Sequence, residues 1–547
     1  MGKLTLPKIL LNLFDTSSEG LWTMSAGNVI RFYNYTFYQQ FNISLERADL
    51  NDWLVLVHPE DRADWTQTLD ALQQGQVYDQ VRARYRVKNG SGRYIWVEVT
   101  AVKVEDGDGF AIVGSHKDVS EEILLNRYLK HMANHDSETG LLKCHQFLRH
   151  APTLIEGGWV FVCSLVHFQQ FQRKIGNIAA RQLSSTLVSM LDEVLFFEYD
   201  LYRISADIFV VTAEKNLSID RIITLMDEME SFFQKKGQTG NQSLTSKLGV
   251  GAMPVNNLNF ENPLEKIFNL SEYTRLVQSP ITYTGKHRQH IDRHFEIQDS
   301  LEAAIENRQI SIALQPIIET STGDLLSFEV LSRWEHSKLG WISPDEFIPM
   351  AEQLGYIHTL GMVVLTQACE YLVMFDAINK SRPLINVNIS AHQLLNPCFV
   401  DDVLAVVNKF EVSPGRVVLE ITESYLLDKD SGISNGLRLL NSLGFKLSID
   451  DFGAGMSAIT SLFRLPLYQI KLDKGLVNDA MKADACVNFM AHLCDFGQTH
   501  RIVIVAEGVE SSEMFDKLKE IGVPYLQGHF LYKPCAPHQW LKNSAVV

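Results

Sequence analysis

Two adjacent carboxylates, Asp450 and Asp451, end an apolar segment of the chain, Lys446-Leu-Ser-Ile-Asp-Asp-Phe-Gly453. This segment has the composition of a buried strand, and an acidic pair at the end of a buried strand is costly unless a cation neutralises it. Carboxylate and amide oxygens are the ligands that hard divalent cations such as Mg²⁺ or Mn²⁺ prefer. The pair therefore indicates a divalent metal site.

Further polar residues follow short apolar segments on both sides of this pair. They are Glu329, Asn388, Glu420, Lys471 and Glu507. Patterns typical of helices separate these segments, which is the arrangement of an α/β fold. We predict a TIM-like (β/α)8 barrel over residues 286–547, with these side chains gathered at its C-terminal face.

Length, charge and cysteine content limit what the chain can be. Its 547 residues predict about three domains. The net charge of −16 argues against a nucleic-acid polymer as partner, although bound cations leave room for a small phosphate ligand. No run approaches the ~18 apolar residues needed to cross a bilayer, so we expect no membrane insertion. Seven cysteines without a CxxC pair predict reduced thiols in the cytoplasm and no structural zinc.

Residues 1–120 are predicted to form an α+β domain with an antiparallel sheet, because alternating segments flank the turn Asn89-Gly-Ser-Gly92. Three strings in it resemble a PAS sensor domain: Val57-His-Pro-Glu-Asp-Arg62, Arg93-Tyr-Ile-Trp-Val97 and Gly114-Ser-His-Lys-Asp-Val-Ser-Glu121. The resemblance implies a cavity that holds haem, flavin, a small acid or nothing, and the ligand is unknown. His58 and His116 are candidate ligands by residue type alone, and ordinary structural histidines are the alternative.

Residues 121–135 are predicted to form a linker helix. Their apolar residues have the spacing of an amphipathic helix: Ile123, Leu124, Tyr128, Leu129 and Met132. Two interpretations remain open. The helix forms a short parallel coiled coil in a homodimer, or it packs against its own domain.

Residues 136–285 are predicted to form a second α/β domain. Asp136-Ser-Glu-Thr-Gly-Leu-Leu142 resembles the entry motif of GGDEF domains, the nucleotide-cyclase fold that makes cyclic di-GMP, and the namesake motif aligns with Ser205-Ala-Asp-Ile-Phe209. By this resemblance Ile208 replaces the catalytic Glu and Ser164 replaces a metal-binding Asp, so the domain is degenerate and we expect no cyclase activity. The family's product site needs an Arg where Phe197 stands, three residues before Asp200. Weak nucleotide binding is an alternative to a purely structural role.

The barrel region resembles an EAL-type cyclic di-GMP phosphodiesterase along its whole length. The motifs stand in order, and among them are Phe328-Glu-Val-Leu-Ser-Arg-Trp334, Asn386-Val-Asn-Ile-Ser390, Leu419-Glu-Ile-Thr-Glu-Ser424, Asp450-Asp-Phe-Gly-Ala-Gly455 and Ala506-Glu-Gly-Val-Glu510. The resemblance implies hydrolysis of cyclic di-GMP to linear pGpG with two Mg²⁺ or Mn²⁺ ions. The alternative is a catalytically inactive receptor that binds cyclic di-GMP and acts through a protein partner.

The resemblance also assigns roles to residues. The metal ligands are Glu329, Asn388, Glu420, Asp450 and Asp451, and the catalytic residues are Glu507, Lys471 and Asp451. Residues expected to contact the dinucleotide are Gln315, Arg333, Glu510 and Gln527, and Glu423 is the expected loop anchor. Departures from the family pattern are Val330 in the namesake tripeptide and Met456 and Ala458 in the loop after the Asp pair. Val330 should point away from the site by strand alternation.

Overall fold

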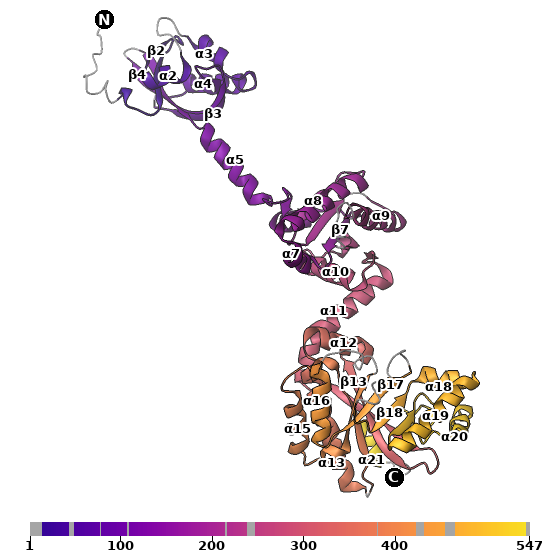
Figure 1. Ribbon diagram of the computed structural model, residues 1–547. Coiled ribbons are helices and arrows are strands. Elements are labelled where there is room, and N and C mark those ends of the chain that lie inside the picture. Colours follow the sequence, from indigo (N-terminus) through magenta and orange to yellow (C-terminus); the bar gives the residue numbers. More distant parts are fainter. Residues whose placement is uncertain are drawn as a thin grey trace. The chain divides into compact units, whose positions relative to one another are not determined.

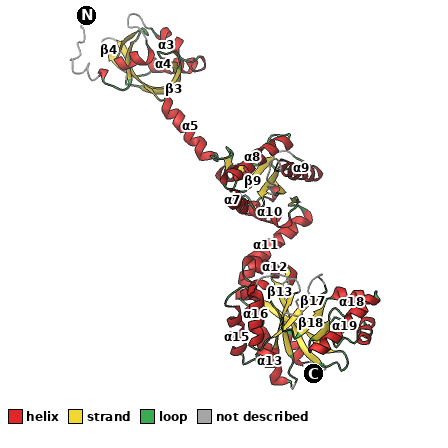
Figure 2. Ribbon diagram, in the orientation of Figure 1, coloured by secondary structure: helices red, strands yellow, loops and turns green. Residues whose placement is uncertain are grey.

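The computed structural model describes residues 14–42, 49–76, 78–106, 109–213, 216–237, 247–379, 381–422, 431–453 and 465–542 (Figure 1). Glu423, Met456 and Ala458 lie outside the described residues. The chain divides into two compact units, residues 1–283 and 284–547. Three sheets are present in the described part, and each is confined to one of the three predicted domains (Figure 2).

The N-terminal sheet has the order β2-β1-β5-β4-β3, and all its neighbouring strands are antiparallel. The predicted hairpin is β3 and β4, joined at the predicted Gly-containing turn. The elements are β1 (Gly20–Ser25), β2 (Ile30–Tyr33), α2 (Tyr35–Phe41), α3 (Leu50–Leu56), α4 (Arg62–Gln74), β3 (Gln80–Lys88), β4 (Tyr94–Asp106) and β5 (Gly109–Asp118).

The middle sheet has the order β11-β10-β7-β9-β8-β6, and its central strands β7, β9 and β10 are apolar and buried. A helix, α5 (Ser120–Asn134), precedes it where the linker helix was expected. The other elements are β6 (Leu142–Lys143), α6 (Cys144–His150), β7 (Trp159–Leu165), α7 (Phe168–Ile175), α8 (Asn177–Val194), β8 (Asp200–Arg203), β9 (Ile208–Ala213), α9 (Ile219–Gly237), β10 (Leu248–Pro254), α10 (Pro263–Val277) and β11 (Ile281–Thr282).

The third sheet closes into a barrel, because β12 pairs with both β13 and β20. Its strands are β12 (Ile310–Glu319), β13 (Leu325–His336), β15 (Leu384–Asn388), β16 (Val417–Thr422), β17 (Lys446–Phe452), β18 (Gln469–Leu472), β19 (Val503–Ala506) and β20 (Tyr525–Leu526), with β14 (Gly340–Ile342) added at the edge of β13. Strand β12 is antiparallel to both of its neighbours, whereas the pairs from β13 through β20 are parallel.

Helices surround the barrel and bury its outer strand faces (Figure 2). They are α11 (Gly285–Glu306), α12 (Pro344–Leu354), α13 (Ile357–Ile378), α14 (Ala391–Leu394), α15 (Phe399–Lys409), α16 (Ser431–Ser442), α18 (Lys474–Ala480), α19 (Asp484–His500), α20 (Ser512–Ile521) and α21 (Pro537–Lys542). Val330 is 3% exposed and belongs to this outer core, as strand alternation predicts.

Helix α13 is long and apolar enough, by length and composition, to cross a membrane. The sequence reading did not expect such a segment, because charged residues interrupt its apolar run. In the structure α13 packs on the barrel and contributes Leu365, Cys369, Leu372 and Phe375 to the core. Core helices pass the same test, so this single helix is weak evidence for a membrane.

Candidate metal-dependent active site

Lys471 stands at the centre of the predicted acidic cluster. Its Nζ atom lies 2.6 Å from Glu507, 3.0 Å from Asp450, 3.2 Å from Glu420 and 3.3 Å from Glu329. The Lys471 and Glu420 side chains are 1% and 0% exposed. One ammonium therefore faces four carboxylates in the barrel interior, which leaves an excess of negative charge that favours binding of cations.

Strand periodicity explains how residues distant in the sequence meet here. Side chains two residues apart on a strand share a face, and the barrel interior is one face of every strand. Neighbouring strands are also in register, with Asn388 beside Glu420 and Thr422 beside Asp450. The predicted ligands consequently come from β13, β15, β16 and β17, and Glu507 follows directly after β19.

The adjacent pair Asp450 and Asp451 reaches one site although consecutive strand residues normally face opposite sides. The pairing of β17 with β18 is irregular between Ile449 and Phe452, so the pair lies in a bulge-like interruption. Asp451 also has a φ of 55°, in the left-handed region that few non-glycine residues adopt. This backbone conformation costs ~1–2 kcal/mol and marks a functional position.

Two groups of carboxylates are close enough to hold metal ions. Glu329, Glu420 and Asp450 form one group, and Asp450, Asp451 and Glu507 form the other, with one ligand atom of each residue within 4.8 Å of the others in its group. Asp450 is common to both, which suits a residue that bridges two ions. Asn388 contacts the first group, since its Nδ2 donates to Glu329 at 3.3 Å. The donor set therefore fits hard divalent cations.

Burial and mutual repulsion perturb the ionisation of this cluster. Burial raises the pKa of Glu507 to about 8, although Lys471 opposes the shift. Burial likewise raises the pKa of Glu420 well above its usual value. Burial alone would lower the pKa of Lys471, but the four carboxylates outweigh it and hold this pKa above its ordinary value. Lys471 is therefore a permanent cation.

A second layer of polar side chains supports the cluster. The sequence analysis did not predict a role for these residues. Asn386 donates from Nδ2 to Glu420 and to Gln469, at 2.8 Å in both cases. Asn386, Gln469 and Ser448 each precede an assigned residue by two positions and are fully buried. This spacing of two was the signal that could have revealed the supporting layer.

The four residues that were predicted to contact the substrate have different surroundings. Gln527 is buried and donates to Glu329 at 2.6 Å and to Gln315 at 3.0 Å, so these amides brace a metal ligand in this structure. Arg333 is partly buried, and its guanidinium lies over the Trp341 ring at 6.0 Å. Glu510 is exposed and pairs with Lys474 at 2.6 Å. The cluster therefore brings together the metal ligands, Lys471 and Glu507, but not Glu510.

Models of known protein families match two regions of the chain. Residues 298–534 match the model of the EAL domain, and residues 30–116 match that of the PAS fold. The barrel is an EAL domain. The N-terminal sheet is a PAS domain.

Curated proteins are also similar to this chain in sequence. Oxygen sensor protein DosP of Escherichia coli K12 is 26% identical over 413 residues, which are 75% of this chain and 52% of DosP. The bifunctional diguanylate cyclase/cyclic di-GMP phosphodiesterase MucR of Pseudomonas aeruginosa is 33% identical over 251 residues, 46% of this chain and 36% of MucR. The chain thus spans about a third to a half of the length of these relatives.

A solved structure of the PaMucR phosphodiesterase in complex with c-di-GMP is also similar to this chain. It is 32% identical, and the match covers 45% of this chain and 99% of that one, with a TM-score of 0.43.

The positions that the resemblance to GGDEF domains singled out, Ser164 and Ile208, are buried in the middle domain. Ser164 is fully buried, and its Oγ lies 2.7 Å from Oγ of Ser271. Ile208 is the register partner of Ser164 in the neighbouring strand and is also buried. Asp207 pairs with Arg275 at 2.9 Å. The groups at the positions predicted to replace a metal carboxylate and a catalytic acid therefore already have partners in the fold.

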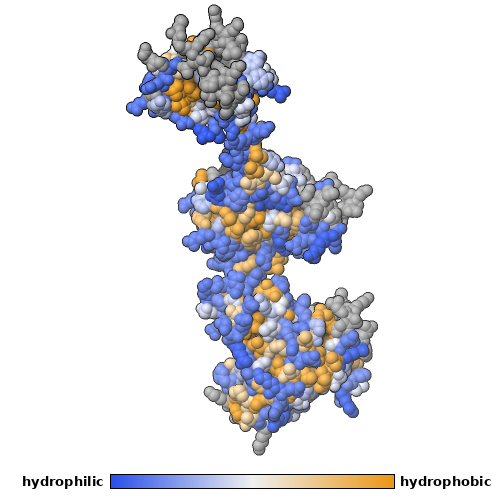
Figure 3. Space-filling view, turned by 90° about the vertical axis from the view of Figure 1, so that its left-hand side faces the viewer, coloured by the Kyte–Doolittle hydropathy of each residue, from blue (hydrophilic) through white to orange (hydrophobic). Residues whose placement is uncertain are grey.

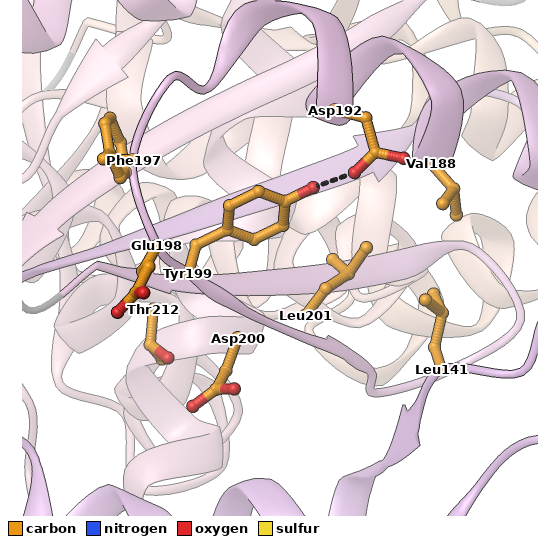
Figure 4. Close-up of a pocket in the computed structure, with 9 residues that line it drawn as sticks. All are labelled: Leu141, Val188, Asp192, Phe197, Glu198, Tyr199, Asp200, Leu201 and Thr212. Atoms are coloured by element: carbon orange, nitrogen blue, oxygen red, sulfur yellow. Dashed lines mark hydrogen bonds between the residues drawn. The ribbon is translucent and has the colours of Figure 1, made fainter.

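A pocket of about 760 Å³ opens in the middle domain where Phe197 and Asp200 stand (Figure 4). Asp192 and Glu198 also line it, and Tyr199 donates to Asp192 at 2.5 Å. Among the side chains that the structure describes, three carboxylates and no cation line this pocket. A lining of this charge disfavours a phosphate ligand.

The PAS interior is closely filled around His116. A cavity of about 20 Å³ remains there, lined by Trp22, Phe37, Trp53 and other apolar residues. His116 is 2% exposed, and its Nε2 lies 2.6 Å from the Tyr85 hydroxyl, which accepts from Trp53. Burial lowers the pKa of His116 to about 3, so this ring is neutral. In this conformation the cavity is too small for haem or flavin. His58 lies elsewhere, against Tyr94.

Proposed function

We propose that the EAL domain hydrolyses one 3′–5′ phosphodiester bond of cyclic di-GMP and releases linear pGpG. The observation that carries this proposal is the cluster of four carboxylates around Lys471, on the strands and in the order that the family motifs require. We further propose that the protein acts in the cytoplasm, and that the PAS and degenerate GGDEF domains regulate turnover.

Glu329, Asn388, Glu420, Asp450 and Asp451 would hold two Mg²⁺ or Mn²⁺ ions. When bound, such ions neutralise the non-bridging phosphate oxygens and lower the pKa of water. The acidic excess of the cluster supports this assignment.

The remaining chemistry belongs to the side chains of this chain. A water oxygen attacks phosphorus, the bond from phosphorus to one 3′ oxygen breaks, and that oxygen takes up a proton from solvent water. Glu507 accepts the proton of the attacking water, and its raised pKa makes it a stronger base than an ordinary carboxylate. Lys471 orients that water and stabilises charge that develops on the phosphate. Arg333 binds a phosphate through its planar fork.

The middle domain is proposed to make no cyclic di-GMP. The hydrogen bond between Ser164 and Ser271 and the buried Ile208 support this part of the proposal. Incubation of the full chain with GTP and Mg²⁺ tests it, because any cyclic di-GMP above a no-enzyme control contradicts it.

The experiment that tests the main function is turnover of cyclic di-GMP by the purified full chain with Mg²⁺ or Mn²⁺. We expect pGpG to appear and the Glu507→Gln variant to bind substrate without turning it over. Binding without turnover by the wild-type chain would instead support the receptor alternative.

A further inference from the structure

Arg333 has no carboxylate partner among the ion pairs of the described residues. Its Nη1 donates to the carbonyl of the adjacent Ser332 at 2.8 Å, and its guanidinium lies over Trp341. Glu329 and Arg333 are four residues apart on β13, so they share a face and are separated by ~13 Å along the strand. The position of Arg333 therefore depends on β13 and on the Trp341 ring beside it.

Trp341 belongs to β14, a three-residue strand at the edge of the sheet. It is 55% exposed, and β14 pairs with β13 alone. A three-residue strand with a single neighbour forms few backbone hydrogen bonds. A second contact would therefore hold the Trp341 ring more firmly.

Arg293 of α11 supplies that contact. Its Nη1 and Nη2 donate to the carbonyls of Leu339 and Trp341, at 3.3 and 3.1 Å. The same guanidinium makes a two-point contact with Glu346, at 2.8 and 2.9 Å. Glu346 also caps α12, because it accepts from the Ser343 N–H at 3.2 Å. We call these four residues, Arg293, Leu339, Trp341 and Glu346, the hairpin clamp.

Helix α11 is a firm support for this clamp. Ile291, Phe295 and Ile297 are buried on either side of Arg293. Charge-assisted, two-point Arg–carboxylate contacts are the geometrically specific kind of hydrogen bond. A continuous set of contacts therefore runs from α11 through Arg293 and the Trp341 backbone to the Trp341 ring and the Arg333 guanidinium.

We propose that Arg293 is a positioning residue for substrate binding, because the hairpin clamp fixes Trp341 and thereby orients Arg333 toward a phosphate of the cyclic dinucleotide. This inference rests on the proposed function and deepens it.

The test measures cyclic di-GMP affinity in the full-length Glu507→Gln chain, where turnover does not interfere. Arg293→Gln should weaken binding by about five- to tenfold, as expected for loss of charge-assisted contacts that fix a binding group. In the chain with Glu507 intact, KM should rise by the same factor while kcat stays within twofold. A purely structural defect would instead lower kcat with the folded fraction.

A double-mutant cycle tests whether Arg293 affects binding through Arg333. Arg333→Met weakens binding by itself, and adding Arg293→Gln should then weaken it no further, because the two residues act through one contact. Glu346→Gln serves as a second variant, since Gln also functions at this capping position. It should reproduce the direction of the Arg293 effect even if Arg293→Gln folds poorly.

Lys338→Gln is the matched control. Lys338 joins the same turn to Glu296 of the same helix at 2.9 Å, but through exposed side chains and without touching the β14 backbone. It should leave affinity within twofold.

The proposal is overturned if Arg293→Gln and Glu346→Gln both leave affinity unchanged, or if Arg293→Gln weakens binding equally with and without Arg333. A wild-type chain that binds but does not hydrolyse contradicts the proposed function and leaves this affinity test intact.

Discussion

Asp450 belongs to both carboxylate groups of the barrel. Removing its charge should therefore affect the proposed metal site more than removing the charge of any other ligand. Asp450→Asn keeps the shape of the side chain and removes one negative charge. We expect hydrolysis to fall at least about a hundredfold, because loss of a metal ligand costs orders of magnitude. Turnover at saturating Mn²⁺ checks this. Asp473→Asn is the control, since Asp473 caps α18 by accepting from the Gly475 N–H and Asn caps equally well. Retention of a tenth of wild-type turnover by Asp450→Asn would reject the assignment.

Glu507 links metal binding to pH. With a pKa of about 8 in the metal-free protein, it carries a proton at pH 6–7. Cation binding favours the charged carboxylate and must release that proton, so affinity rises with pH and levels off above the pKa. We expect the Mn²⁺ affinity of the full chain to increase by up to about tenfold per pH unit between pH 6 and 8, measured by calorimetry. Glu507→Gln should reduce this slope without abolishing it, because burial also raises the pKa of Glu420. A slope as steep as that of the wild-type chain would show that Glu507 does not release a proton.

Among the strands of the middle domain, β7 and β9 carry the two buried residues, Ser164 and Ile208, on which the proposed lack of cyclase activity depends. Ser164 is fully buried against Ser271 of α10, so a carboxylate there would be desolvated without a cation. We expect Ser164→Asp to lower the melting temperature of this domain by several degrees and to create no cyclase activity. Ser164→Ala is the milder control, since it leaves one hydroxyl unpaired at a cost of ~1–3 kcal/mol. A stable Ser164→Asp chain that makes cyclic di-GMP would contradict the packing argument.

Elements with a strict period were predictable from the sequence. Glu329, Glu420 and Asp450 were predicted because each follows a short apolar segment, and these segments are β13, β16 and β17. The hairpin of β3 and β4 followed from its turn. Two features were missed. The antiparallel direction of β12 relative to β13 was missed although only residues 320–324 connect the two strands and Gly323 is among them, which is the pattern of a hairpin. Gln315 and Gln527 have the residue types of substrate contacts, but they bond to each other across 212 positions. Such pairing is set by tertiary structure alone.

Asn386 and Gln469 were missed for a different reason. They lie on the same inward face as the assigned residues, but an amide inside a barrel also occurs as ordinary packing. Only their mutual hydrogen bond and the contact with Glu420 reveal their role.

At the scale of the whole molecule, helix α5 presents an apolar face that is exposed in the described part of the chain. Leu124, Leu125, Tyr128 and Leu129 are all more than half exposed, and none of the residues of α5 is buried. The alternative that α5 packs on its own domain finds no support in this burial pattern. Figure 3 shows apolar residues among the polar ones at the molecular surface. The exposed face remains compatible with the predicted homodimer.

A dimer joined through α5 would let the N-terminal domains influence the barrel, since a ligand biases turnover only if it binds two arrangements unequally. We predict that the full chain is a dimer at micromolar concentration. Tyr128→Glu should weaken dimerisation at least about tenfold, because it places a charge in the apolar contact. Sedimentation of both variants measures this. Asn126→Glu adds the same charge at an exposed position off the apolar face and should leave the dimer intact. Equal dissociation of the two variants would implicate net charge, and a monomeric wild-type chain would refute the dimer itself.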